Sequence, residues 1–101
     1  MIIYNITTKI SWRIHDKWKE WLLDVQLPGI MSTGLFERYQ LVRLLEVDEE
    51  DGPTYALQLH SASLENIDIY RYKHLDDTER QEREMWEDDI ISFRSLMQVI
   101  N

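Results

Sequence analysis

The spacing of the apolar residues changes four times along the chain, and this order of periods restricts the fold more than any other feature. From Ile2 to Ser11 the side chains alternate between a more apolar and a less apolar set, which is the two-residue period of a β-strand. The period then lengthens to three and four residues, as on one stripe of an amphipathic helix: Ile14, Trp18, Trp21, Leu22 and Val25. Pro28 and Gly29 predict the end of this helix.

The middle of the chain predicts a β-hairpin. Residues 35–47 and 54–62 have strand character, and Asp51 with Gly52 predicts a tight reversal between them. The acidic residues 48–51 lack the alternating ligand spacing of a calcium-binding loop. We therefore expect them to form a solvated tip.

The last part of the chain predicts helices followed by a strand. Ser63 is suited to cap a helix that runs to about His74. A second helix is predicted over about residues 77–88, and the alternating segment 90–99 predicts the fourth strand.

This order of elements predicts the α+β fold class and, within it, the ferredoxin-like arrangement. Four strands form an antiparallel sheet in the order 4-1-3-2, and right-handed crossovers place the helices on one face. The length of 101 residues and the apolar fraction of 44% suit one core, so we expect a single domain over residues 1–101. In that core the apolar side of the first helix should pack against residues of the first and last strands. These are Trp18, Leu22 and Val25 on the helix, and Tyr4, Ile6, Phe93 and Met97 on the strands.

The face of the sheet away from the helices should carry the less apolar residues of each strand. We predict that a cleft on this face is lined by Asn5, Thr7, Arg43, Gln58, His60 and Arg94. Ile3, Ala56, Leu96 and a leucine at 44 or 45 are mixed among them, so the face is too apolar to lie wholly in water. The sequence therefore predicts a homodimer that packs sheet to sheet around the cleft.

Each candidate residue has a structural alternative. His60 suits a general base, or a half-buried histidine hydrogen-bonded to a neighbour. Arg94 suits the clamping of a substrate carboxylate, or an ion pair with Glu46 or Glu37. Arg43 and Glu46 suit a catalytic pair or a cross-strand salt bridge. They point to opposite faces of the predicted strand unless it contains a bulge, so the face on which each lies stays undecided.

Composition argues against several classes of partner and cofactor. The net charge of −8 disfavours nucleic acid and anionic membranes, and no apolar run reaches the ~20 residues that span a bilayer. The three histidines lie on separate elements without ligand spacing, and three glycines form no phosphate loop, so we expect neither metal nor cofactor. A chain without cysteine or a secretory leader is expected in the cytoplasm.

Five segments resemble a bacterial domain of unknown function (family 4286): MIIYN, HDKWKEWL, MSTGLF, RLLEVDEEDGPTYALQ and FRSLMQV. That family is similar to the dimeric α/β-barrel superfamily, whose relatives include cofactor-free monooxygenases, lactone isomerases and stress-response proteins. The resemblance implies the fold and the dimer, and it implies no activity. The family pattern has a histidine before the proline that ends the first helix, where this chain has Gln26, and another before the last helix, where it reads KHLDDTERQ. A role that needed those histidines would not carry over to this chain.

Three functions remain open at this point. The first is a ligand-binding or regulatory module, with a small molecule held in the cleft. The second is a cofactor-independent enzyme on a small organic acid or aromatic, in which Arg94 or Arg43 orients the substrate and His60 moves a proton. The third is a structural interaction protein whose bare sheet is only an interface.

Overall fold

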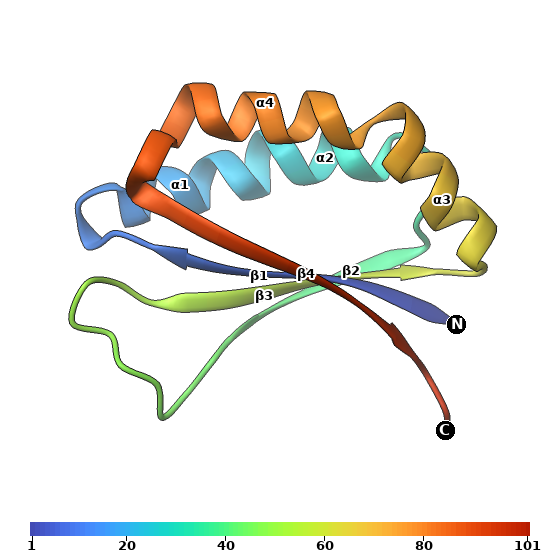
Figure 1. Cartoon of the computed structure of the whole chain (residues 1–101), viewed down its shortest axis with the longest axis horizontal. Helices are drawn as coiled ribbons and strands as arrows, with labels where there is room; N and C mark the ends of the chain where they lie inside the picture. Colours follow the sequence, from blue (N-terminus) through green and yellow to red (C-terminus); the bar gives the residue numbers. More distant parts are fainter.

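The computed structural model describes residues 1–101 as a sheet covered by helices on one face (Figure 1). The four strands are antiparallel and lie in the order β2-β3-β1-β4, which confirms the predicted topology. Their bounds are β1 Ile2–Ile10, β2 Arg38–Arg43, β3 Thr54–Ser61 and β4 Ile90–Gln98. The predicted α+β, ferredoxin-like fold class is therefore correct.

The helices form two groups above the sheet (Figure 1). The first follows β1 and comprises η1 Trp12–Ile14, α1 His15–Trp21, the π-helical η2 Leu22–Gln26 and α2 Leu27–Met31. The second follows β3 and comprises α3 Leu64–Lys73, α4 Leu75–Trp86 and the short η3 Glu87–Asp89. None of these helices combines the length and the apolar character that crossing a bilayer requires.

The first helical group does not end at Pro28, contrary to the prediction. The backbone N–H of Leu27 bonds to the carbonyl of Leu22, five residues back, so the helix widens into a π turn just before the proline. Because proline has no N–H to donate, a wider turn at this point accommodates it without a break. The helix instead ends at Met31, and the turn after it contains Gly34, whose φ of +75° suits a residue without a Cβ atom.

The reversal between β2 and β3 is a long loop, not a tight turn at Asp51-Gly52. β2 ends at Arg43, earlier than predicted, and β3 begins at Thr54. The loop is held from outside the sheet, since the indole N–H of Trp12 donates to the carbonyl of Glu49 at 2.8 Å. Gly52 packs so closely on the backbone of Ile10 that a Cβ atom there would lie 1.6 Å from the Ile10 carbonyl oxygen.

The core lies between the sheet and the helices. Trp18, Leu22, Tyr4 and Ile6 are buried in it, as predicted. Three other predicted core residues are wrong: Val25, Phe93 and Met97 are 56%, 69% and 36% exposed.

The pairing of β4 with β1 explains why the predictions for Phe93 and Met97 are wrong. Arg94 lies opposite Ile6 and Leu96 opposite Tyr4, so these two point toward the helices. Phe93 lies opposite Thr7 and therefore points to the other side, which we call the open face. The predicted phase of the fourth strand is thus inverted.

Ser63 caps α3 as predicted, since its hydroxyl accepts the backbone N–H of Asn66 at 3.1 Å. The next helix begins at Leu75, slightly before the predicted position. Residues Thr78, Glu82 and Trp86 follow one another at steps of four along α4, so they share the side that faces the sheet. Two of these three are polar, and this gives the molecule a polar region beneath a helix.

Candidate functional site

A chamber lies between the sheet and the helices α1 and α4. The space inside it is about 20 Å³, which is room for roughly one water molecule. Most of the wall is apolar, from Ile6, Trp18, Leu22, Leu41, Tyr55, Leu57 and Ile90. The polar members of the wall are Thr8, Gln26, Glu82 and Ser92.

A more polar opening adjoins this chamber and shares three of its residues: Glu82, Ile90 and Ser92. The other residues of this mouth are Glu79, Arg83, Glu87 and Arg94. The site therefore consists of a charged mouth of about 230 Å³ between α4 and the edge strand β4, with a much smaller apolar chamber beneath it.

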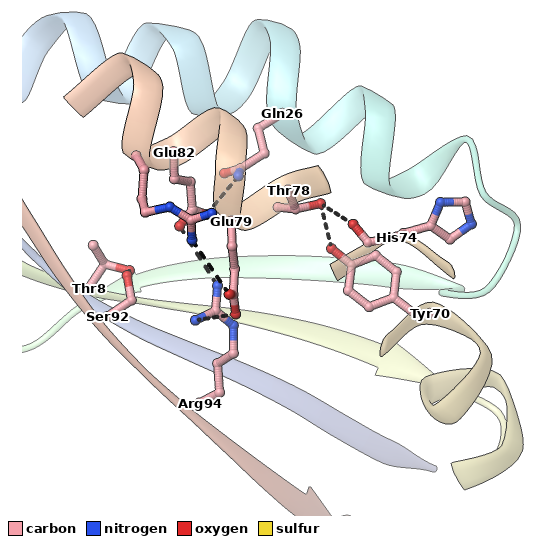
Figure 2. Close-up of polar contacts among 10 residues, drawn as sticks. Thr8, Gln26, Tyr70, His74, Thr78, Glu79, Glu82, Ser92 and Arg94 are labelled. Carbon is pink, nitrogen blue, oxygen red and sulfur yellow. Dashed lines mark hydrogen bonds and ion pairs between the residues drawn. The ribbon is translucent and has the colours of Figure 1, made fainter. Parts of the chain in front are cut away.

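Glu82 is the buried acid of the site. Its side chain is only 14% exposed. The amide Nε2 of Gln26 donates a hydrogen bond of 2.8 Å to Glu82 Oε1 (Figure 2). Burial raises the pKa of the Glu82 carboxyl above its ordinary value, against the lowering effects of the Gln26 hydrogen bond and the Arg94 charge.

Arg94 reaches the mouth from β4. Its guanidinium lies 3.7 Å from Glu79 Oε1 and 3.7 Å from Glu82 Oε2 (Figure 2). Both contacts are ion pairs too long to be hydrogen bonds. Nε and Nη2 of Arg94 are buried without a hydrogen-bond partner, while the residue as a whole lines the mouth, so its positive charge faces the opening.

A pair of hydroxyls forms part of the chamber wall. Thr8 and Ser92 are cross-strand partners on β1 and β4, and their side-chain oxygens are 2.9 Å apart (Figure 2). Either hydroxyl can donate to the other, which leaves the second hydrogen free for a ligand.

The first turn of α4 is anchored by a separate set of contacts (Figure 2). Thr78 Oγ1 donates to the carbonyl of His74 at 3.1 Å and lies 3.3 Å from the hydroxyl of Tyr70. Burial raises the pKa of Tyr70, whose ring packs against Tyr4. Thr78 therefore joins α4 to Tyr70 of α3, and these contacts help to fix the helix that carries Glu82.

The six predicted cleft residues do not share a face. Asn5, Thr7, Gln58 and His60 lie on the open face as predicted. The prediction is wrong for Arg43 and Arg94, which have the helix-facing phase of their strands: Arg43 pairs with Tyr55, and Arg94 with Ile6. A ligand cleft on the open face stays a prediction.

Both misplaced arginines have other partners than those predicted. Arg43 forms two hydrogen bonds with Glu49, at 3.0 and 2.7 Å, and its guanidinium lies 5.9 Å from the Trp12 ring. The hydrogen bond to Glu49 raises the pKa of Arg43 and lowers that of Glu49. Arg43 therefore fastens the β2–β3 loop, whereas Arg94 belongs to the chamber mouth.

On the open face, Asn5 Nδ2 donates to Thr7 Oγ1 at 3.0 Å and to Ser95 Oγ at 3.4 Å. His60 is 7% exposed, and its Nδ1 has no hydrogen-bond partner. A buried imidazole nitrogen without a partner costs free energy, so the open face leaves one polar group without a hydrogen bond.

Sequence reasoning missed Gln26, Glu82, Thr8 and Ser92. The detectable signal was in α4, where Glu82 falls between Thr78 and Trp86 at steps of four. A glutamate on the stripe of an amphipathic helix is unusual because its charge must be desolvated. No group of three or more His, Asp or Glu side chains is placed to hold a metal ion.

Comparison with known proteins agrees with this architecture. A family model described as "Domain of unknown function (DUF4286)" matches residues 1–100. The chain belongs to this family. The resemblance noted in the sequence is thereby confirmed, and it extends over almost the whole DUF4286 chain. No curated protein sequence matches it.

Solved structures share the fold of this DUF4286 protein at low identity. An ethyl tert-butyl ether (EthD) family protein from Bacillus halodurans has a TM-score of 0.72 at 8% identity, covering 99% of this chain and 100% of that one. A dimeric ferredoxin-like protein from an uncultured marine organism has a TM-score of 0.67 at 8% identity, with coverage of 100% and 96%. An antibiotic biosynthesis monooxygenase has a TM-score of 0.60 at 15% identity, and both chains are fully covered at 100%. At these identities the likeness shows the fold alone.

Proposed function

We propose that this DUF4286 protein binds a small organic molecule in the mouth between α4 and β4 and transfers a proton through Glu82, without a cofactor. The observation that carries the proposal is the state of Glu82, a carboxyl desolvated beside an apolar chamber and hydrogen-bonded by Gln26. A carboxyl whose pKa is raised by burial suits general acid–base chemistry. The antibiotic biosynthesis monooxygenase among the structural neighbours supports an enzyme only by analogy of fold.

The chamber and the mouth have different roles in this proposal. The chamber has room for about one water molecule beside the Glu82 carboxyl, so the ligand would lie in the mouth, which has a volume of about 230 Å³. The Arg94 guanidinium, which lines the mouth, suits a ligand with a carbonyl or carboxylate oxygen. Negative charge that develops on such an oxygen during proton transfer would be stabilised by the guanidinium.

A chromogenic probe of carboxylate bases tests the proposal. In 5-nitrobenzisoxazole a base removes the ring C–H proton, the C–H electron pair forms the nitrile, and the N–O bond breaks to leave a coloured 2-cyano-4-nitrophenolate. We expect the protein to accelerate this reaction over buffer, with a rate that rises with pH as Glu82 ionises. Glu82→Gln should abolish the acceleration, because an amide cannot take up the proton.

The matched control is Glu84→Gln, on the same helix with a side chain that is 69% exposed. It should leave the rate unchanged. Equal rates for wild type and Glu82→Gln would refute acid–base catalysis by Glu82. If the probe binds and Glu82 has no effect on its fate, a binding module without catalysis is the better description.

A second proposal concerns the open face, which we infer to join two copies of the chain. Ile91, Phe93 and Met97 are exposed on it, and His60 Nδ1 is buried there without a partner. The strand residues of this face include no Asp or Glu, although the chain has 19 of them. Two such faces can meet without carboxylate repulsion, whereas the helix side is strongly acidic.

The structural neighbours support the same inference, since one is described as a dimeric ferredoxin-like protein. In such a dimer Asn5, Thr7, Gln58 and His60 would line the interface, where the predicted polar cleft would lie. A specific interface should bury more than ~1,000 Å² in total. Light scattering at micromolar concentration tests it, and a mass near the single chain's 12.3 kDa would refute it.

A further inference from the structure

The chamber between the sheet and the helices has the size of a single water molecule. Its space of about 20 Å³ is room for roughly one water. A water in a protein interior also needs about two to four polar partners. The wall supplies four polar side chains, from Thr8, Gln26, Glu82 and Ser92. Because the other wall residues are apolar, these four groups determine where a water is held.

The polar groups of the wall suit a water that lies between the strands and α4. Figure 2 shows the Thr8–Ser92 pair on the strands and Glu82 on α4. The two hydroxyls share one hydrogen between them, so the pair can donate the other to a water oxygen. Glu82 Oε1 accepts from Gln26, whereas Oε2 accepts no hydrogen bond within the chain, so the carboxylate can accept from the same water. One lone pair of the water oxygen stays free.

The mouth places a ligand beside this water. Glu82, Ile90 and Ser92 line both the chamber and the mouth, so a molecule in the mouth lies next to the chamber. Arg94 also lines the mouth, with its guanidinium 3.7 Å from Glu82 Oε2. A carbonyl oxygen bound by Arg94 would therefore bring its carbon close to the water and to the carboxylate that can activate it.

We propose that the chamber holds the attacking water of a hydrolysis reaction, and that the ligand of the mouth is a small carboxylic ester. Glu82 takes a proton from the water as the water oxygen forms a bond to the ester carbonyl carbon. The electron pair of the C=O π bond moves to the carbonyl oxygen, and Arg94 stabilises its negative charge. When this pair returns, the C–O bond to the alcohol breaks, and the alcohol oxygen takes the proton from Glu82. One ester and one water thus give one acid and one alcohol.

Thr8 and Ser92 are positioning residues in this reaction, because they act on the ester only through the water. The proposal rests on the proposed function, since it uses the same mouth and the same base. It adds the class of ligand, the class of reaction and a reason for the small polar chamber beside Glu82.

The probe for this reaction is 4-nitrophenyl acetate, whose hydrolysis releases coloured 4-nitrophenolate. We expect the wild-type protein to accelerate hydrolysis over buffer, and to do so more slowly in heavy water, because a proton leaves the attacking water in the slow step. Glu82→Gln should lose the acceleration. The matched control is Glu84→Gln, 69% exposed on the same helix, which should keep it. Hydrolysis as fast in Glu82→Gln as in wild type would come from other groups of the surface and would overturn the proposal.

A double variant, Thr8→Val with Ser92→Ala, tests the water itself. It removes both hydroxyls and changes the shape of the wall little, so the chamber keeps its room and loses its donors. Ester hydrolysis should fall roughly tenfold relative to the elimination of 5-nitrobenzisoxazole, in which no water reacts. An equal change in both reactions would be a structural effect on Glu82 and would refute the role of the chamber water.

The two proposals fail in different ways. If Glu82 catalyses the elimination but ester hydrolysis does not depend on Glu82, only the chamber water and the ester are wrong. If neither reaction depends on Glu82, the proposed function is wrong as well.

Discussion

Gln26 Nε2 donates a 2.8 Å hydrogen bond to Oε1 of Glu82, and this contact joins the π-helical segment η2 to α4. Both side chains line the chamber wall. The hydrogen bond favours the ionised carboxylate, while burial favours the protonated form. Gln26 therefore limits how far the pKa of Glu82 is raised.

Removing this donor should raise the pKa of Glu82 further. In Gln26→Leu the burial of the carboxyl persists, and the hydrogen bond that stabilises its charge is lost. Carboxyl carbon NMR over a pH series measures the change. Gln81→Leu, at an exposed position on α4, should leave the Glu82 titration where it is in wild type. A Glu82 pKa that falls or does not move in Gln26→Leu would show that the amide has no such role.

Glu82→Gln should make the protein more stable than wild type at neutral pH. The folded-state pKa of Glu82 lies above its unfolded value, so its stabilising contribution is complete below the unfolded pKa and declines as pH rises through the folded one. Each unit of pKa difference corresponds to about 1.4 kcal/mol. Urea unfolding should give equal free energies for both proteins at pH near 4 and a higher value for the variant at pH near 7. A wild type that is the more stable at neutral pH would contradict this prediction.

Gly52→Ala should destabilise the fold by about 2 kcal/mol or more, since the new Cβ would collide with the carbonyl of Ile10. Gly29→Ala is the matched control. Nothing lies within 4 Å of a Cβ at position 29, and it sits in α2. That change should stabilise by about 0.5–1 kcal/mol, the difference in helix propensity. Thermal unfolding of both variants measures the contrast, and equal melting temperatures would refute it.

Phe93→Asp should dissociate the proposed dimer. The Phe93 side chain is 69% exposed on the open face, and a two-fold interface would bring two introduced carboxylates into an apolar region. Sedimentation velocity should show the variant at half the mass of wild type. Tyr72→Asp, at a position 90% exposed on α3, should leave the mass of wild type unchanged. If the Phe93→Asp variant remains a dimer, the interface lies on another surface.

The order of elements follows from the sequence alone, and with it the topology of the sheet. The alternation in residues 2–10 and the helical stripe with Trp18 and Leu22 are local patterns, and the buried side of each follows from its own residues. Ser63 likewise caps α3 through a contact three residues away. Such features depend on neighbours in sequence, so the sequence determines them.

The site depended on contacts that no local pattern contains. β4 carries apolar residues on both phases, with Leu96 on one and Phe93 and Met97 on the other, so alternation could not tell which phase meets the helices. Pairing with β1 decided it, and turned Arg94 toward the helices.

The same reason applies to the buried acid of the site. Glu82 meets Gln26 across 56 residues of sequence. Each residue alone is typical of a solvated surface. Only the packing of α1 and α4 over one sheet removes water from them, and that desolvation gives Glu82 its raised pKa.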